Sequence, residues 1–310
     1  MKREIEDKCG EAYSHMSLGE VYKSIGEYRK AKEHLDKSLA IHKEIGHRKG
    51  EASSYMNLGE VYQSVGEYKK AREHLEKSLS IQKEFRDRSG EACSYRNLGV
   101  VYGSVGKYEN AREHLEKSLA IQKEVGDGRG EAASYMRIGE VYQSVNKYEK
   151  AREHLEKSLA IQKEIGDRNG EASSYTNLGV VYVSVGKYEK ARENLEKSLA
   201  IKKEIGDING EASSYFTLGA VYQSIGENDK ALNCWDKSLK ISRDIGERSS
   251  VASSCRNLRA IFLSLGKYHK ANEYNEKALA IFTDIGDKEG VASVCVNQGL
   301  VEQAVGKRIF

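Results

Sequence analysis

Asparagine returns at one position of the sequence in steps of 40 residues, and its side chain could hold a peptide backbone. A carboxamide carries one acceptor and two donors, which can pair with the N–H and C=O groups of an extended peptide. Asparagine is also a poor helix former, with no obvious local task in mid-helix. The column contains Asn57, Asn97, Asn177, Asn257 and Asn297, and it is interrupted by Ser17, Arg137 and Thr217. Either these residues form a ladder that binds a backbone regardless of its side chains, or duplication copied a neutral residue.

A histidine column has the same spacing and could suggest a metal site. Its members are His34, His74, His114 and His154. Metal donors must lie within about 2 Å of one ion, whereas equivalent residues of stacked helices are about 8–10 Å apart. We therefore expect these side chains to pack between repeats with exposed edges. The sequence contains no Ser/His/Asp set, phosphate loop or paired carboxylates apart from the repeat pattern, so we predict neither an enzyme nor a cofactor.

Variable columns beside the asparagines could select the side chains of a ligand. Methionine suits an adaptable surface, and exposed apolar residues gathered in one concavity suggest an interaction site. From about residue 170 onward the columns become apolar. With the asparagine column and Arg137, the candidate binding residues are Met56, Arg96, Met136, Val180, Val183 and Phe216.

All of these columns result from a repeat of 40 residues. The sequence Gly-Glu-Ala begins at residues 10, 50, 90, 130, 170 and 210, and degraded forms begin at 250 and 290. A period in this range is typical of a solenoid, because one unit cannot bury its apolar face alone and must stack on its neighbours. We therefore predict an all-α chain built from stacked helical hairpins.

Residues 167 to 206 illustrate one repeat. Asp167 is a good N-cap, and Gly186 can end the first helix in the left-handed region, a place that Asn146 takes in the preceding repeat. Gly179 recurs inside the first helix although glycine there costs up to about 1 kcal/mol. We interpret Gly179 and Ala191 as small residues that let the two helices approach closely.

Whole-chain properties limit the possible partners. The net charge of +3 is small for 310 residues, and without a long basic run we expect neither nucleic-acid nor membrane-surface binding. No apolar run reaches the roughly 18 residues of a membrane span. The 5 cysteines show no CxxC or CxH pair, which favours reduced thiols in a cytoplasmic protein.

The repeat resembles the tetratricopeptide repeat. The residues that carry the resemblance are Tyr55, Leu58, Gly59, Tyr62, Gly66, Tyr68, Ala71 and Ser78. The period of 40 and the absence of proline depart from the common pattern and resemble the Leu-Gly-Asn/Pins adaptors and large animal repeat arrays. The resemblance implies a right-handed α-α superhelical solenoid whose first helices line a concave groove that holds an extended peptide.

We expect one array over residues 1–310, with repeats starting near 10, 50, 90, 130, 170, 210 and 250 and a single helix at about 290–304. Arg259 and Asn275 replace a glycine and a core leucine, and we interpret them as part of a polar outer face that caps the stack. A fragment of a longer protein is the competing explanation. The function that we predict is a protein-binding adaptor, and the alternative is a structural spacer, a self-assembling scaffold or the repeat part of a larger signalling or receptor protein. The identity of the partner and the oligomeric state stay open.

Overall fold

Helices joined by short turns are the only regular secondary structure over residues 2–295, which are the residues that this computed structural model describes, with side chains from residue 7 onward. Residues 1–167 and 168–310 form two compact units. The first unit contains α1 (Lys2–Ser24), α2 (Tyr28–Glu44), α3 (Arg48–Ser64), α4 (Tyr68–Glu84), α5 (Arg88–Ser104), α6 (Tyr108–Val125), α7 (Gly128–Ser144) and α8 (Tyr148–Glu164). The second contains α9 (Arg168–Ser184), α10 (Tyr188–Glu204), α11 (Ile208–Ser224), α12 (Asn228–Asp244), α13 (Arg248–Ser264) and α14 (Tyr268–Asp284).

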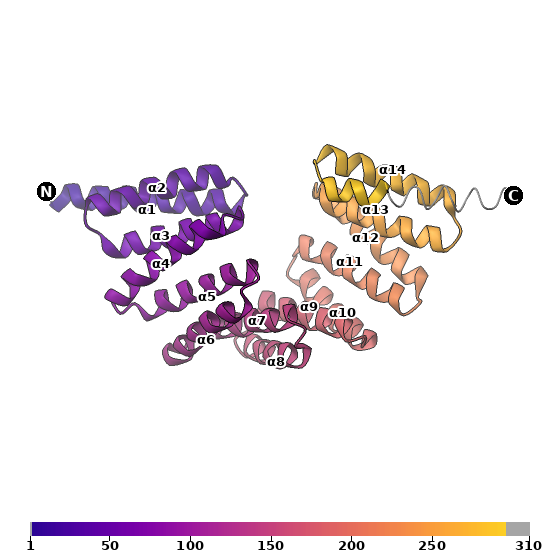
Figure 1. Cartoon of the computed structure of the whole chain (residues 1–310), viewed down its shortest axis with the longest axis horizontal. Helices are drawn as coiled ribbons and strands as arrows, with labels where there is room; N and C mark the ends of the chain where they lie inside the picture. The colour runs from indigo at the N-terminus through magenta and orange to yellow at the C-terminus, as the bar shows by residue number, and fades with distance from the viewer. Residues whose placement is uncertain (1, 296–310) are drawn as a thin grey trace. The chain divides into compact units, whose positions relative to one another are not determined.

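Within each unit, two antiparallel helices form a hairpin, and each hairpin packs on the next (Figure 1). This arrangement confirms the predicted all-α solenoid of helical hairpins. A further helix begins at residue 288 and is described to residue 295, so most of the lone helix predicted at 290–304 lies outside the described residues. Within residues 2–295, no helix has the length and apolar character needed to cross a membrane.

The predicted helix boundaries follow from local backbone chemistry. The carboxylates of Asp87, Asp127 and Asp207 accept hydrogen bonds of 3.0, 2.9 and 2.8 Å from the backbone N–H three residues later. These N-caps satisfy donors that have no partner inside the helix. Gly186 ends α9 with φ of +71°, and Asn146 adopts φ of +57° at the equivalent place, as predicted.

The two helices of a hairpin touch at a glycine, as predicted for Gly179. A Cβ atom at Gly179 would lie 2.7 Å from Cγ of Leu195 and 3.4 Å from the carbonyl oxygen of Ala191. Leu195 and Ala191 are both fully buried. Glycine therefore recurs inside the first helix because a larger residue has no room there.

Consecutive hairpins are joined by buried serines, which we call the serine seam. Ser78 of α4 donates to the carbonyl oxygen of Ala52 at 2.8 Å, and Ser94 of α5 lies 3.3 Å from the Ser78 hydroxyl. Ser94 also lies 2.7 Å from Oε1 of Gln82. The next junction repeats the arrangement with Ser118, Ser134 and Gln122. The seam satisfies polar groups that would otherwise be buried without partners.

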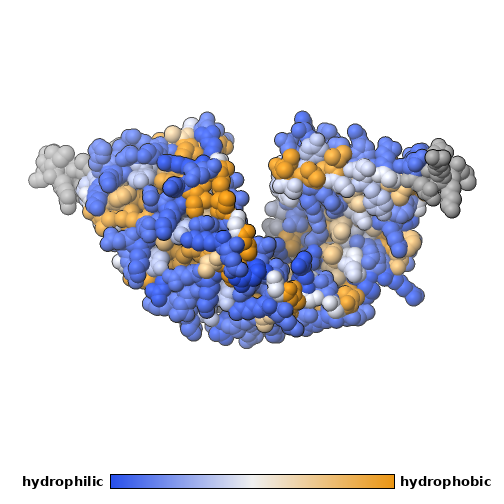
Figure 2. All heavy atoms as spheres, turned by 180° about the vertical axis from the view of Figure 1, so that it is seen from behind, coloured by the Kyte–Doolittle hydropathy of each residue, from blue (hydrophilic) through white to orange (hydrophobic). Residues whose placement is uncertain are grey.

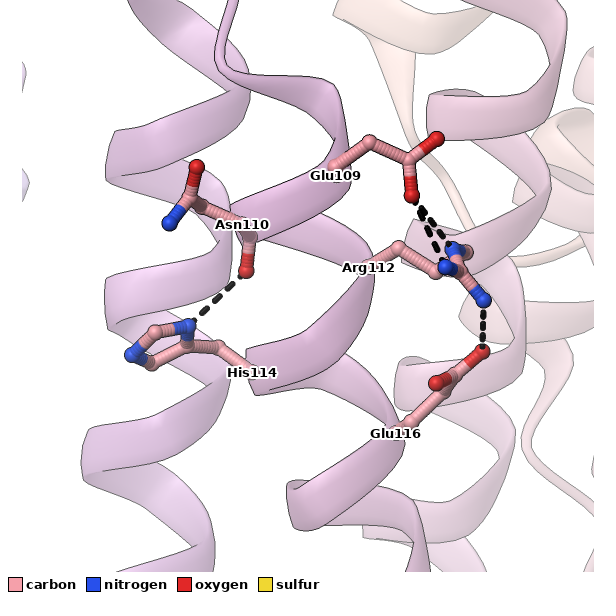
Figure 3. A network of polar contacts seen from close by, with 5 residues as sticks. All are labelled: Glu109, Asn110, Arg112, His114 and Glu116. Atoms are coloured by element: carbon pink, nitrogen blue, oxygen red, sulfur yellow. Dashed lines mark hydrogen bonds and ion pairs between the residues drawn. The ribbon is translucent and has the colours of Figure 1, made fainter.

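The outer faces of the second helices carry charged networks, as Figure 3 shows for α6. Arg112 donates to Glu109 at 2.8 Å and to Glu116 at 3.0 Å. These contacts raise the pKa of Arg112 and lower that of Glu109. Since Glu109 is exposed, water screens the pair and it adds little to the free energy of folding.

The interpretation of Arg259 and Asn275 as a polar outer face is wrong, because both side chains are buried, with exposed fractions of 5% and 1%. They occupy the two positions at which Gly59 faces Leu75 in another hairpin. Two buried polar side chains thus stand where other hairpins have a contact between glycine and leucine. Nε and Nη1 of Arg259 and Oδ1 of Asn275 have no hydrogen-bond partner among the described residues.

Candidate functional site

The candidate ligand-binding residues lie on the first helices of the hairpins. In the first unit they occupy α3, α5 and α7, and in the second α9, α11 and α13. Asn297 lies outside the described residues.

The asparagines of the first unit connect consecutive first helices. Nδ2 of Asn57 donates to Glu20 at 2.8 Å, and Nδ2 of Asn97 donates to Glu60 at 2.9 Å. Asn57 is only 7% exposed, whereas Asn97 is half-buried. The expectation that asparagine has no local task is wrong for these two residues, since each holds one hairpin to the preceding one.

The same contacts orient the rest of each amide. Glu60 also forms an ion pair with Lys23 at 2.5 Å, so its carboxylate is held from two sides. Nδ2 of Asn97 is therefore fixed toward Glu60, and among the described residues its second N–H and its Oδ1 make no hydrogen bond. Asn57 makes the equivalent single bond but is almost fully buried, so Asn97 is the one of the two whose remaining polar atoms a ligand can reach.

A hollow of about 400 Å³ brings three candidate residues together in the first unit. Arg96, Asn97 and Arg137 line it together with Lys23 and Glu60. Arg137 donates to Glu140 at 2.8 Å, so a carboxylate already balances its charge. Nη2 of Arg96 lies 3.9 Å from the sulfur of Cys93, and none of the described carboxylates pairs with Arg96. The hollow thus combines a backbone-binding amide with a cation that lacks an anionic partner.

Met56 and Met136, the remaining candidates of this unit, are both half-buried. Met56 packs against the buried cluster that contains Tyr55 and Leu58. Neither methionine lines the hollow.

In the second unit, Asn177, Val180, Val183, Phe216 and Asn257 are all half-buried. Val183 packs beside the cluster formed by Ala191 and Leu195. Phe216 lines a cavity of about 190 Å³ between α11, α12 and α13, which contains none of the other candidates. The apolar residues of this unit are thus not gathered into one described pocket.

The histidine column serves packing inside hairpins. The ring of His74 lies 5.0 Å from that of Tyr62 and 5.7 Å from that of Tyr55, and both tyrosines belong to the same hairpin. Its Nδ1 lies 2.8 Å from the carbonyl oxygen of Lys70, and burial lowers the pKa of the ring. His114 repeats the contact with Asn110, as Figure 3 shows. The expected packing between repeats is therefore corrected to packing within a repeat.

Reasoning from columns 40 residues apart missed the carboxylates that hold the asparagines, although the sequence contains their signal. Each contact joins residues 37 positions apart. The sequence has glutamate 37 positions before Asn57, Asn97 and Asn177, valine 37 positions before Arg137 and Thr217, and alanine 37 positions before Asn257 and Asn297. The co-occurrence therefore indicates a pair for Asn57, Asn97 and Asn177 and none for Asn257 and Asn297.

Most of the visible surface carries hydrophilic residues, with hydrophobic residues in separate patches (Figure 2). The exposed large hydrophobic side chains include Val65, Val105, Val125 and Ile165, each next to a helix end. Such single residues are normal on protein surfaces and mark no site.

Comparison with known proteins places this architecture in a family. Three solved structures illustrate the likeness in fold. Aspartyl phosphate phosphatase F from Bacillus subtilis has a TM-score of 0.69 and 17% identity, covering 90% of this chain and 72% of that one. A Rap protein complexed with Competence and Sporulation Factor has a TM-score of 0.63 and 16% identity, covering 99% of both chains. A putative kinesin light chain from Podospora anserina has a TM-score of 0.54 and 24% identity, covering 65% of this chain and 98% of that one.

A search of curated protein sequences gave no match. The model of the tetratricopeptide repeat matches residues 10–84, 90–164, 130–204 and 210–284, which together span most of the sequence. The chain therefore belongs to the tetratricopeptide repeat family.

Proposed function

We propose that the chain is an adaptor that binds an extended peptide segment of a partner protein along the first helices of its hairpins, as Pins-type adaptors do. Proteins with tetratricopeptide repeats are generally protein-interaction modules. The likeness to a Rap protein solved with Competence and Sporulation Factor is a likeness of fold alone, and it supports no particular residue.

The observation that carries the proposal is the hollow around Asn97. Glu60 accepts a hydrogen bond of 2.9 Å from one N–H of the Asn97 amide, which leaves Oδ1 and the second N–H of Asn97 for the backbone of a ligand. Because Glu60 is itself held by Lys23, the amide loses little conformational freedom when a ligand binds. Such preorganisation lowers the entropic cost of association.

Arg96 gives this hollow a preference for a ligand group with negative charge. Its guanidinium has no carboxylate partner among the described residues, in contrast to Arg137. A ligand carboxylate beside Arg96 would gain a charge-assisted hydrogen bond without breaking an existing ion pair. We therefore expect an aspartate or glutamate in the ligand next to the segment held by Asn97.

Selection of random linear peptides displayed on phage against the full chain tests the proposal. The affinity of each selected peptide is then measured by fluorescence anisotropy for wild type and for Asn97→Ala with Asn177→Ala. Each asparagine would lose hydrogen bonds of about 0.5–1.5 kcal/mol. Together this is a loss of roughly 5-fold to more than 100-fold in affinity, similar for peptides of different sequence.

The matched control is Asn110→Ala, which makes the same chemical change on the outer face of α6, where only the backbone carbonyl of Asn110 is used (Figure 3). It should bind like wild type. If no peptide is enriched, or if the double variant keeps full affinity even though it has lost the hydrogen bond between Asn97 and Glu60, the adaptor proposal fails and a structural spacer or scaffold becomes the better explanation.

We also propose that the protein works in the cytoplasm. Its cysteines are free thiols, among them Cys234 and Cys255, which are buried. Burial raises the pKa of both thiols and makes them unreactive. Cell fractionation would test this location, and recovery of the protein in a secreted fraction would contradict it.

A further inference from the structure

One junction between hairpins lacks a side chain that the others have. The last turn of each second helix carries a residue that faces the third residue of the next first helix, and that third residue is usually glycine. These pairs are His42 with Gly50, Gln82 with Gly90, Gln122 with Gly130, Gln162 with Gly170, Lys202 with Gly210 and Phe282 with Gly290.

A large side chain fills the junction in these pairs. A Cβ atom at Gly90 would lie 2.5 Å from Oδ2 of Asp87 and 2.8 Å from Nε2 of Gln82, and one at Gly130 would lie 2.1 Å from Oδ2 of Asp127 and 2.7 Å from Nε2 of Gln122. Real Cβ contacts are not this short, so the capping aspartate and the glutamine together favour glycine at these positions.

The junction between α12 and α13 has two serines instead, Ser242 and Ser250. Two small side chains leave space, and the cavity of about 190 Å³ lies at this place. Its lining includes Ser213, Phe216, Ser238, Ser242, Ser250 and Ser253. Ser242 is fully buried, and its hydroxyl has no hydrogen-bond partner among the described residues. A buried hydroxyl without a partner is unfavourable unless a ligand or water completes it.

The start of α13 supplies a second unsatisfied donor. Asp207 caps the preceding first helix by accepting from Gly210 at 2.8 Å, whereas the side chain of Glu247, the N-cap of α13, makes no capping hydrogen bond. Ser250 is an exposed residue of this first turn, and among the described residues its backbone N–H has no capping acceptor, so it is open to water or to a ligand at the rim of the cavity that it lines. The cavity therefore offers a donor at a helix N-terminus beside a buried hydroxyl.

Two of the other junctions place a carboxamide in such surroundings, whereas His42, Lys202 and Phe282 take its position elsewhere. Oε1 of Gln82 accepts a hydrogen bond from Ser94 at 2.7 Å, and Gln122 does the same with Ser134. The serine seam continues at the exceptional junction, where the Ser238 and Ser254 hydroxyls lie 3.3 Å apart. The serines that accompany a glutamine elsewhere are thus retained where the glutamine has been lost; at the Gln122 junction they satisfy the carboxamide oxygen, while Nε2 has no partner among the described residues.

We propose that this cavity binds the side-chain carboxamide of a glutamine or asparagine in the peptide ligand, an inference that rests on the proposed function. The carboxamide oxygen accepts from the N–H of Ser250, and its NH₂ group donates to the hydroxyl of Ser242. Phe216 packs against the methylene groups of the inserted side chain. Glu247 also lines the cavity, so a carboxylate of similar shape would face a like charge.

The cavity can be tested without a peptide. We would titrate the full chain with N-acetyl-glutamine methylamide, and with the glutamate and leucine analogues as comparison probes, while following backbone amide signals by NMR. The glutamine probe should shift the signals of Ser242, Ser250 and Phe216 with an affinity at least about 10-fold above that of either comparison probe. Equal shifts with all three probes, or none with the glutamine probe, would overturn the proposal.

The residues of another junction suggest a double variant that fills the cavity. Ser242→Gln with Ser250→Gly recreates the pair that Gln82 and Gly90 form, so this double variant should fold and melt at a higher temperature than wild type. It should no longer bind the glutamine probe. The reciprocal control is Gln82→Ser with Asp87→Glu and Gly90→Ser, which copies Ser242, Glu247 and Ser250, frees the N–H that Asp87 caps, and should open a second cavity with new probe shifts at Ser94. Unchanged probe binding by the filled variant would contradict the proposal.

Peptides selected on the wild-type chain separate this inference from the proposed function. They should share a glutamine or asparagine whose replacement by alanine weakens binding to wild type but not to the filled variant. Peptides that depend on Asn97 yet bind the filled variant equally well would refute the carboxamide site and leave the adaptor function intact. If the chain binds the glutamine probe but no peptide is selected, the carboxamide site is supported and the adaptor function is refuted.

Discussion

Two glycines of the same helix should respond in opposite directions to replacement by alanine. A Cβ atom at Gly99 of α5 would lie 2.6 Å from Cγ of Leu115 and 3.1 Å from the carbonyl oxygen of Ala111. At Gly103, four residues later in α5, the nearest atom would be Cβ of Ala111, at 3.9 Å. The chemical change is the same at both positions, and only the available space differs.

The magnitude follows from two opposing effects. Alanine in place of a helical glycine gains about 0.5–1 kcal/mol, because it restricts the unfolded chain. Forcing an extra carbon into a packed site costs about 1–3 kcal/mol. Gly103→Ala should therefore stabilise the protein slightly, and Gly99→Ala should be less stable than Gly103→Ala by about 1–3 kcal/mol, since the backbone contribution is similar in both.

Guanidinium chloride unfolding, followed by far-ultraviolet circular dichroism, measures this difference. Hydrogen exchange of the α5 and α6 amides provides a local measurement, which matters because a solenoid can loosen one repeat at a time. The cause can be isolated by adding Leu115→Ala, which should be less destabilising in the Gly99→Ala background because it removes the clashing atoms. Equal unfolding midpoints for the two glycine variants, or no coupling between Gly99 and Leu115, would refute the close-approach argument.

Three further predictions test burial at other positions. Burial lowers the pKa of His42, so the His42 side chain binds a proton more tightly in the unfolded chain than in the folded one, and the folded state loses stability as the pH falls below about 6.5. His42→Gln should therefore make the urea unfolding midpoint depend less on pH between pH 8 and pH 5. The same pH dependence in wild type and variant would contradict this. Arg259→Gly with Asn275→Leu should raise the melting temperature, because each unsatisfied buried group costs about 1–3 kcal/mol; a lower melting temperature would show that the polar pair is stabilising. Leu178→Ala should cost about 2–5 kcal/mol because it empties a buried site, whereas Ser184→Ala on the surface should cost under about 0.5 kcal/mol in the same denaturant melts; similar losses would mean that the two faces of α9 are assigned wrongly.

The helices and their ends could be predicted from the sequence because the rules that determine them are local. An aspartate before the first turn and a residue in the left-handed region after the last one act within a few residues. Asn146 at a glycine position was informative for this reason, and its φ of +57° confirms the prediction. Gly179 could be interpreted in the same way, because repetition of an unfavourable helix residue indicates a packing constraint.

The contacts between side chains could not be predicted from columns alone. Asn57 and Glu20 lie 37 residues apart, so comparing positions 40 apart separates the two partners into unrelated columns. The prediction for Arg259 was wrong for a different reason. A charged residue near the end of an array is usually solvated, but here a second substitution, at Asn275, makes room for it inside the hairpin. Only pairs of substitutions considered together would have revealed this.

The junctions of the first unit have a consequence for how the gene can change its length. Gln82, Gly90 and Ser94 are matched residue for residue by Gln122, Gly130 and Ser134. Loss of residues 90–129 would bring Gln82 against Gly130 and Ser134, and the new junction would contain the same donors and acceptors as the two that it replaces. Unequal recombination in this part of the gene can therefore shorten or lengthen the protein in whole repeats without creating a mismatched interface. A crossover that separates Ser242 from Ser250 joins unlike partners, so this junction keeps its place while the uniform ones can vary in number.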